Sequence, residues 1–200
     1  SLTMHFVMSA DSGVSKFSDL EGKTILLGKG SFGAKEGAKY LKLFGLEGKV
    51  KLANVELNNA VPAIKNRQIE GFVTAGSYPA PNVIEAAAGV GVTLISLSDA
   101  QVKKSKRTRL IIPAGTYPGI DTDTVTTSLP VIAYTISNMN NETAYQLTKT
   151  YWNQIATMSK AFPWWNGVSG KMLTNIYGKI HAGALRYYDE AGINVPAANR

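Results

Sequence analysis

Residues 24–33 have the sequence TILLGKGSFG, in which a short apolar strand-like run leads directly into a glycine-rich loop. The next stretch, from about Ala34 to Phe44, reads as a helix and is followed by Gly45, a residue type that commonly ends helices. A strand, a glycine loop and a helix in this order are typical of α/β proteins that bring backbone N–H groups close to an anion. The positive end of the helix dipole then faces that anion.

Strand-like and helix-like stretches alternate on both sides of this loop. The expected strands cover residues 3–9, 24–27, 50–57, 71–74, 92–97, 122–127 and 131–137. The expected helices cover residues 34–44, 60–68, 81–88, 144–158 and 183–191. This alternation predicts a parallel or mixed α/β sheet. The first strand has no obvious partner nearby, and the last third has helices but little sheet, which suggests that part of a domain is missing.

Composition excludes several classes of protein. The chain has 200 residues, of which 44% are hydrophobic, enough for one large or two small domains. It has no cysteine and two histidines, His5 and His181, which argues against thiol catalysis, disulfides and Cys/His zinc sites. The net charge is +7, but five basic residues lie between Lys103 and Arg109, so we expect no broad basic face for nucleic acid. No run approaches the roughly 18 apolar residues of a membrane-spanning helix.

The glycine loop leaves three interpretations open. Gly28, Gly30 and Gly33 match the G-x-G-x-x-G pattern of dinucleotide sites, and Glu56, near the end of the next predicted strand, could accept ribose hydroxyls. The loop could equally bind a carboxylate or another anion, or be a turn that binds nothing. The segment 74–81 follows a predicted strand, where open α/β sheets place their ligands, but its Gly and Pro residues could also simply form a connecting loop.

Other candidate functional residues have plain structural explanations. The basic run has no interleaved aromatic residues to stack on bases and fits a solvated helix end. His181 stands beside a helix start and is expected to be structural. Ser169, in the sequence GVSGK, narrowly misses the G-x-S-x-G pattern of hydrolases. The three tryptophans, Trp152, Trp164 and Trp165, are expected to pack in a core or between lobes.

Several separate stretches match, in order, the motifs of one family. They are Ser12-Gly13 with DLEGK at 19–23, GSFG at 30–33, GFVTAGSYP at 71–79, IPAGTYPG at 112–119 and HAGALRYYDEAG at 181–192. Together they resemble the TAXI-type solute-binding components of TRAP (tripartite ATP-independent periplasmic) transporters, over nearly the whole chain. Two positions depart from the family pattern: Ala34 stands where Thr is usual, and Ala182 where Pro is usual.

The resemblance implies an α/β fold of the type II periplasmic-binding-protein class, in which two lobes joined by hinge strands close on a ligand. Residues 1–11 are then expected to form a first-lobe and hinge strand, and residues 12–110 a complete second α/β lobe. Residues 111–200 would supply the return hinge, a first-lobe strand and the C-terminal helices. Family members have further residues before this point, so the chain is expected to be a C-terminal fragment that lacks most of the first lobe.

The resemblance also implies a function. The chain would bind a small carboxylate, such as glutamate or a dicarboxylate, in a periplasmic or other extracytoplasmic space and deliver it to the TRAP permease subunits. It would be no enzyme and would use no cofactor or metal. The second-lobe wall of the site would comprise Ser31, Gly33, Ala34, Thr74, Ala75, Gly76 and Tyr117. Unpartnered apolar faces of residues 131–137 and 144–158 predict a homodimer or a domain-swapped form. The alternative is an NAD-dependent oxidoreductase that uses the loop from Gly28 to Gly33.

Overall fold

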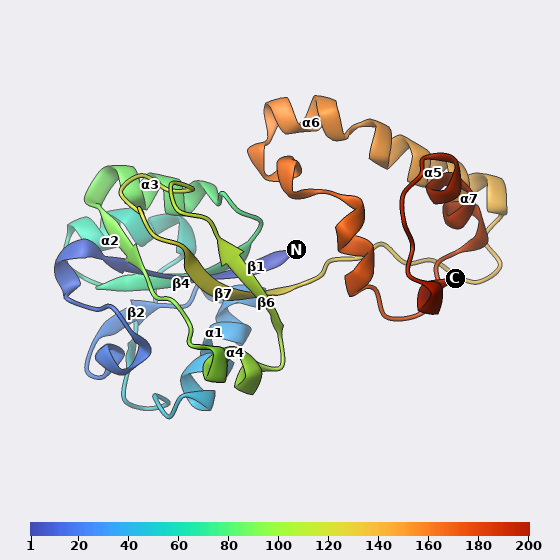
Figure 1. Ribbon diagram of the computed structural model, residues 1–200. Coiled ribbons are helices and arrows are strands. Elements are labelled where there is room, and N and C mark those ends of the chain that lie inside the picture. Colours follow the sequence, from blue (N-terminus) through green and yellow to red (C-terminus); the bar gives the residue numbers. More distant parts are fainter. The chain divides into compact units, whose positions relative to one another are not determined.

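The computed structural model describes residues 1–200 and divides the chain into two compact units, an N-terminal unit (Ser1–Leu129) and a C-terminal unit (Pro130–Arg200). The strands, all in the N-terminal unit, are β1 (Leu2–Ser9), β2 (Thr24–Leu26), β3 (Lys51–Leu52), β4 (Gly71–Gly76), β5 (Val92–Leu94), β6 (Thr108–Ile112) and β7 (Thr124–Leu129). Its α-helices are α1 (Phe32–Leu43), α2 (Ala60–Lys65), α3 (Pro81–Val90) and α4 (Asp99–Ser105). The C-terminal unit contains α5 (Asn141–Asn153), α6 (Ile155–Ala161) and α7 (Ala182–Glu190) (Figure 1).

The seven strands form one mixed sheet in the order β3-β2-β4-β1-β7-β6, with β5 also paired to β1. β2 runs parallel to β3 and β4, whereas β1 is antiparallel to β4, β5 and β7. This sheet confirms the predicted α/β class. The first strand has no partner in its own sequence neighbourhood, as expected, because its partners are distant in sequence: Thr3 lies opposite Gly76 of β4 and Ser128 of β7.

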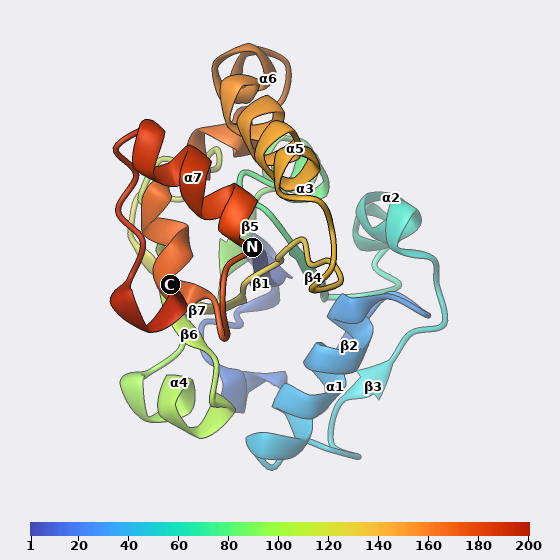
Figure 2. The same ribbon diagram turned by 90° about the vertical axis from the view of Figure 1, so that its right-hand side faces the viewer.

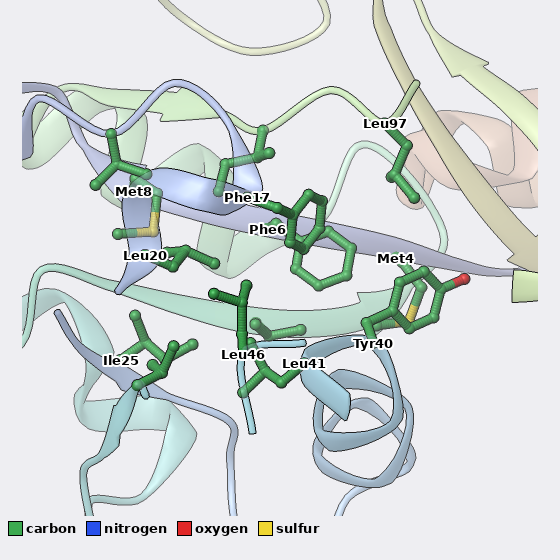
Figure 3. Packing of buried hydrophobic residues seen from close by; sticks show 14 of the residues in the cluster. Met4, Phe6, Met8, Phe17, Leu20, Ile25, Tyr40, Leu41, Leu46 and Leu97 are labelled. Atoms are coloured by element: carbon green, nitrogen blue, oxygen red, sulfur yellow. The ribbon is translucent and has the colours of Figure 1, made fainter. Parts of the chain in front are cut away.

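Helices cover both faces of the sheet, α1 and α4 on one side and α2 and α3 on the other (Figure 1). The alternation of β1 supplies both cores, because successive side chains point to opposite faces. Met4, Phe6 and Met8 pack with α1 and α4, and Val7 packs with α2 and α3. In the first core the Phe6 ring meets the Phe17 ring edge to face at 4.7 Å between centroids (Figure 3).

The strand predicted over residues 50–57 is mostly absent. Only Lys51 and Leu52 pair, both with β2. β2 itself is three residues long and ends at Leu26, and Gly28, two residues further on, has a left-handed conformation with φ 75°. Beyond Leu52 there is no strand with which β3 could pair, so the predicted strand is shortened because β2 is short.

The strand predicted over residues 131–137 is absent, although its residues favour strands. β7 ends at Leu129, and Pro130 follows, which has no N–H to continue a ladder. The side chains of this segment lie in solvent instead, and Tyr134 is 92% exposed.

The C-terminal unit packs α7 along α5 around a small core (Figure 2). That core comprises Tyr145, Leu173, Tyr187, Tyr188 and Val195. The helix predicted over residues 144–158 is interrupted at Gln154, and its apolar stripe is only partly buried: Ala144 is buried, but Leu147 is 60% exposed. No helix of the structure combines the length and apolar character needed to cross a membrane.

The predicted lobe boundaries at residues 11 and 110 stay predictions. Within the structure, residues 1–11 and 111–129 belong to the same compact unit as residues 12–110, because β1, β6 and β7 share the sheet with the other strands.

Candidate functional site

The loop between β2 and α1 forms a capped helix start. Ser31 is the N-cap: its Oγ accepts the N–H of Ala34 at 3.0 Å and donates to the carbonyl of Gly28 at 2.9 Å. Gly28 and Gly30 both have φ of 75°, which L side chains rarely adopt. The glycines and the serine of this motif therefore serve one local purpose, which is to turn β2 into α1 within a few residues.

Gly33 brings the start of α1 into contact with the end of β4. A Cβ atom on Gly33 would lie 3.0 Å from the backbone nitrogen of Ala75 and 3.4 Å from the carbonyl carbon of Thr74. The structure thus places Gly33 against Thr74 and Ala75, and Ala34 and Ala75 pack against the same core, whereas the ligand wall itself stays a prediction. These residues come from two stretches that are separated by about forty positions but are held together because β2 and β4 are adjacent and parallel.

The chemistry offered by this corner is that of an anion cradle. The N–H groups of Phe32 and Gly33 lie in the first turn of α1, where no helical carbonyl stands four residues earlier to accept them. The first turn of α1 contains no acidic residue that would repel an anion. Thr74 is buried, and its side chain lies on the same face of the sheet as His5, its partner in β1, which is the face opposite α1. Gly76 has open space where a side chain would be.

Tyr117, the remaining predicted wall residue, lies in the core on the other face of the sheet and is 1% exposed. Its hydroxyl accepts the N–H of Ala80 at 2.9 Å and lies 2.8 Å from His5 Nε2. His5 Nδ1 lies 3.0 Å from the carbonyl of Thr3. Tyr117 therefore does not share the corner of Ser31, Gly33 and Ala34, and a direct ligand contact for it stays a prediction.

Burial shifts the pKa of both members of this buried pair. It lowers the pKa of His5 to about 4, against a smaller raising effect of the bond to the Thr3 carbonyl. It raises the pKa of Tyr117 to about 12, although the bond from Ala80 acts in the opposite direction. Both side chains are therefore neutral at neutral pH.

The geometry does not favour the dinucleotide alternative. The strand–loop–helix context is present, but the sheet is mixed and β1 runs antiparallel at its centre, whereas dinucleotide folds use a parallel sheet. Glu56, the candidate for the ribose hydroxyls, is exposed in the turn beyond β3. His5 is already engaged with Tyr117 and Thr3 and is not free for proton transfer.

The remaining candidates have structural roles. Within the basic run, Arg107 forms a two-pronged ion pair with Glu36, at 2.9 and 2.6 Å, whereas Lys103 and Lys104 lie in solvent at the end of α4. His181 caps α7 through Nδ1, which accepts the N–H of Gly183 at 3.1 Å. Trp165 is buried, and Trp152 packs against the core of the C-terminal unit.

Sequence reasoning missed the roles of His5 and Ala80. The position of His5, between Met4 and Phe6 on an apolar strand, indicates that a polar side chain is buried and needs partners. One partner, the Thr3 carbonyl, is two residues away, but the other, Tyr117, is 112 residues away, so only the folded chain identifies it.

Taken together, these features define a mixed-sheet α/β protein with a helix N-terminus placed at the end of a neighbouring parallel strand. Residues 2–192 match the model of the NMT1-like family, and the chain belongs to that family.

The chain is also similar to solved structures of binding proteins. They include the alkanesulfonate-binding protein SsuA from Xanthomonas axonopodis pv. citri bound to MOPS, with 13% identity over 96% of this chain and 51% of that chain and a TM-score of 0.43. The periplasmic aliphatic sulphonate binding protein SsuA from Escherichia coli matches with 13% identity over 98% of this chain and 52% of that one, with a TM-score of 0.43. The GluR0 ligand-binding core from Nostoc punctiforme, in complex with (L)-glutamate, matches with 20% identity over 48% of this chain and 41% of that one, at 0.34. The chain spans about half the length of the solved structures that it matches.

Proposed function

We propose that the chain is part of a non-enzymatic solute-binding component of a TRAP-type transporter of the TAXI type. It binds a small carboxylate, of the glutamate or dicarboxylate class, in an extracytoplasmic space and presents it to the membrane permease. Membership of the NMT1-like family and the sequence motifs quoted above support this proposal.

One observation carries the choice of ligand class: Gly33 packs the start of α1 against Thr74 and Ala75. A carboxylate at this corner would accept from the N–H groups of Phe32 and Gly33. The helix dipole favours negative charge at the same place. No acid or base is required, because binding and release change no covalent bond.

In the proposed component this corner is one wall of the site, and the other wall belongs to a first lobe. A ligand held by one wall alone binds weakly, so the experiment must detect weak binding. We therefore choose nuclear magnetic resonance titration of the ¹⁵N-labelled chain with L-glutamate, 2-oxoglutarate, glutamine and NAD, each into the millimolar range.

L-Glutamate or another carboxylate should shift the amide signals of Phe32, Gly33 and Thr74–Gly76 together, along one saturating curve. NAD should leave them in place. The proposal is contradicted if every carboxylate leaves these signals unmoved, or if NAD shifts them and carboxylates do not. The second result would restore the oxidoreductase alternative.

We also propose that the chain self-associates through its exposed apolar residues. Val131, Tyr134 and Ile136 lie in solvent on the segment after β7, and Leu147 lies in solvent on α5. Exposed apolar area of this kind favours association with a second copy. Light scattering coupled to size-exclusion chromatography should give the mass of a dimer at high concentration, and a monomer throughout would contradict this proposal.

A further inference from the structure

The hydroxyl of Tyr117 joins three segments that are far apart in sequence. Tyr117 lies in the loop after β6, His5 lies on the central strand β1, and Ala80 is the N-cap of α3. The hydroxyl is 2.8 Å from His5 Nε2 and accepts the Ala80 N–H at 2.9 Å. All three residues are buried, with 5% exposure or less.

The partners fix the direction of every bond in this network. The Thr3 carbonyl can only accept, so His5 Nδ1 carries the proton and donates to it. His5 Nε2 is then bare and accepts the Tyr117 O–H, which leaves the Tyr117 oxygen to accept from Ala80. Each group uses its donor or acceptor once, and a second proton on His5 would force the Tyr117 O–H to turn away and lose its acceptor.

The network ends where the candidate ligand wall continues into a loop. Thr74 pairs directly with His5 in the β1–β4 register, and Gly76 pairs with Thr3. Residues 77–79 then cross to α3, and the first fixed backbone donor at the far end is Ala80. The loop is thus held by strand pairing at one end and by Tyr117 at the other.

We propose that Tyr117 and His5 are positioning residues for the ligand site: through the N–H of Ala80 they hold the 77–79 loop, and with it the end of β4, in the conformation that binds the carboxylate. This inference rests on the proposed function. It assigns Tyr117 an indirect role on the opposite face of the sheet from α1.

The surroundings of His5 leave few other groups that could titrate with it. Tyr117 is its titratable partner, and Tyr78 packs against the same core and acts on Tyr117. β4 presents Thr74 opposite His5, and β7 presents Thr126, whose hydroxyl bonds the carbonyl of Met4. The pKa of His5 is set by burial and by the bond to the Thr3 carbonyl, and no charged side chain shifts it.

The test compares Tyr117→Phe with Tyr134→Phe, which removes a hydroxyl from a side chain in solvent. In the unliganded chain, Tyr117→Phe should raise the pKa of His5, measured from its ring ¹⁵N signals. It should also speed hydrogen exchange at the Ala80 amide by about tenfold or more, because that amide loses the hydroxyl that accepts its N–H. Tyr134→Phe should change neither. Unchanged exchange and an unchanged His5 pKa in Tyr117→Phe would overturn the positioning role.

The ligand arm uses L-glutamate as the probe on the same variants. Tyr117→Phe should weaken the titration at Phe32 and Gly33 severalfold, although no ligand contact has been removed. Should the unaltered chain fail to respond to any carboxylate, the proposed function falls, whereas an unchanged affinity in Tyr117→Phe overturns the positioning role alone. If Tyr117→Phe does not fold, the ¹⁵N signals of the unaltered chain still decide the bonding pattern, because a His5 protonated at Nε2 contradicts it.

Discussion

Ser31 allows helix stability to be separated from anion binding. Its Oγ caps α1, and a cap of this kind contributes about 1 kcal/mol. Ser31→Ala should lower the free energy of unfolding by about that amount. Ser31→Asp keeps an acceptor for the Ala34 N–H and places a negative charge at the positive end of the helix, so stability should be kept or raised.

The same aspartate should abolish carboxylate binding, because its charge occupies the place of the ligand. Urea unfolding and the L-glutamate titration, run on both variants, separate the two effects. If Ser31→Asp still binds the carboxylate, the anion does not bind at the start of α1.

Gly33 controls how closely α1 approaches β4. In Gly33→Ala the added methyl lies 3.0 Å from the Ala75 nitrogen, so the helix must move by a few tenths of an ångström. We expect weaker carboxylate binding and an overpacking penalty of about 1–3 kcal/mol. The matched control is Gly89→Ala on α3, where the nearest atom is 3.7 Å away. That variant should be neutral or more stable by up to about 1 kcal/mol in urea unfolding.

His5 should make stability depend on pH in a defined window. The pKa of His5 is about 4 in the folded chain and 6.5 when the side chain is exposed, as in the unfolded chain. Between these two pH values the unfolded chain therefore binds more protons than the folded chain. Stability is then complete above pH 6.5 and falls as the pH drops toward 4, by about 3 kcal/mol in all. Carboxylates with lowered pKa, such as Asp189, lose their contribution only at still lower pH.

The measurement is the urea midpoint as a function of pH for the unaltered chain and for His5→Gln. The variant should lose the slope between pH 6.5 and 4. An equal slope in both chains would assign it to another group.

Among the elements, α1 is tied to the segment before β6 by one partly buried ion pair. Glu36 is buried on α1, and Arg107 reaches it with two bonds, at 2.9 and 2.6 Å. Arg107→Met leaves the Glu36 charge without its partner, and such a loss costs about 3–5 kcal/mol. Adding Glu36→Gln to that variant should restore part of the stability, since the unpaired charge is removed. Thermal unfolding of the two single variants and the double variant measures the coupling, and purely additive effects would contradict it.

Elements whose information is local could be predicted from the sequence. α1 follows from the glycine loop and from Gly45, whereas the Ser31 cap and the close approach of Gly33 to residues 74–75 are seen only in the structure. The strand at 131–137 could not be excluded from its residues alone, because Pro130 stops a ladder only when the ladder would continue from β7. The partners of β1 and the network of Tyr117 depend on contacts between distant segments, which no local pattern contains.

At the scale of the whole molecule, the C-terminal unit begins with a segment that has no helix or strand. Residues 131–136 lie in solvent, and Tyr134 is 92% exposed. Limited chymotrypsin treatment should therefore cut after Tyr134 first and leave a folded fragment that contains all strands of the sheet. Mass spectrometry identifies the cut, and circular dichroism checks the fragment. Protection of this site at high protein concentration would support self-association, whereas a first cut inside residues 1–129 would contradict the division into units.

The central place of β1 has a consequence for synthesis on the ribosome. Its pairing with β7 needs Leu129, so β1 must wait for β7 to be translated before this sheet can close. At about 5–20 residues per second, that delay is on the order of 6–24 s. During this time the buried residues of β1, such as Phe6 and Val7, have only partial cover, and a nascent chain stalled before residue 124 should be a preferred client of a holding chaperone.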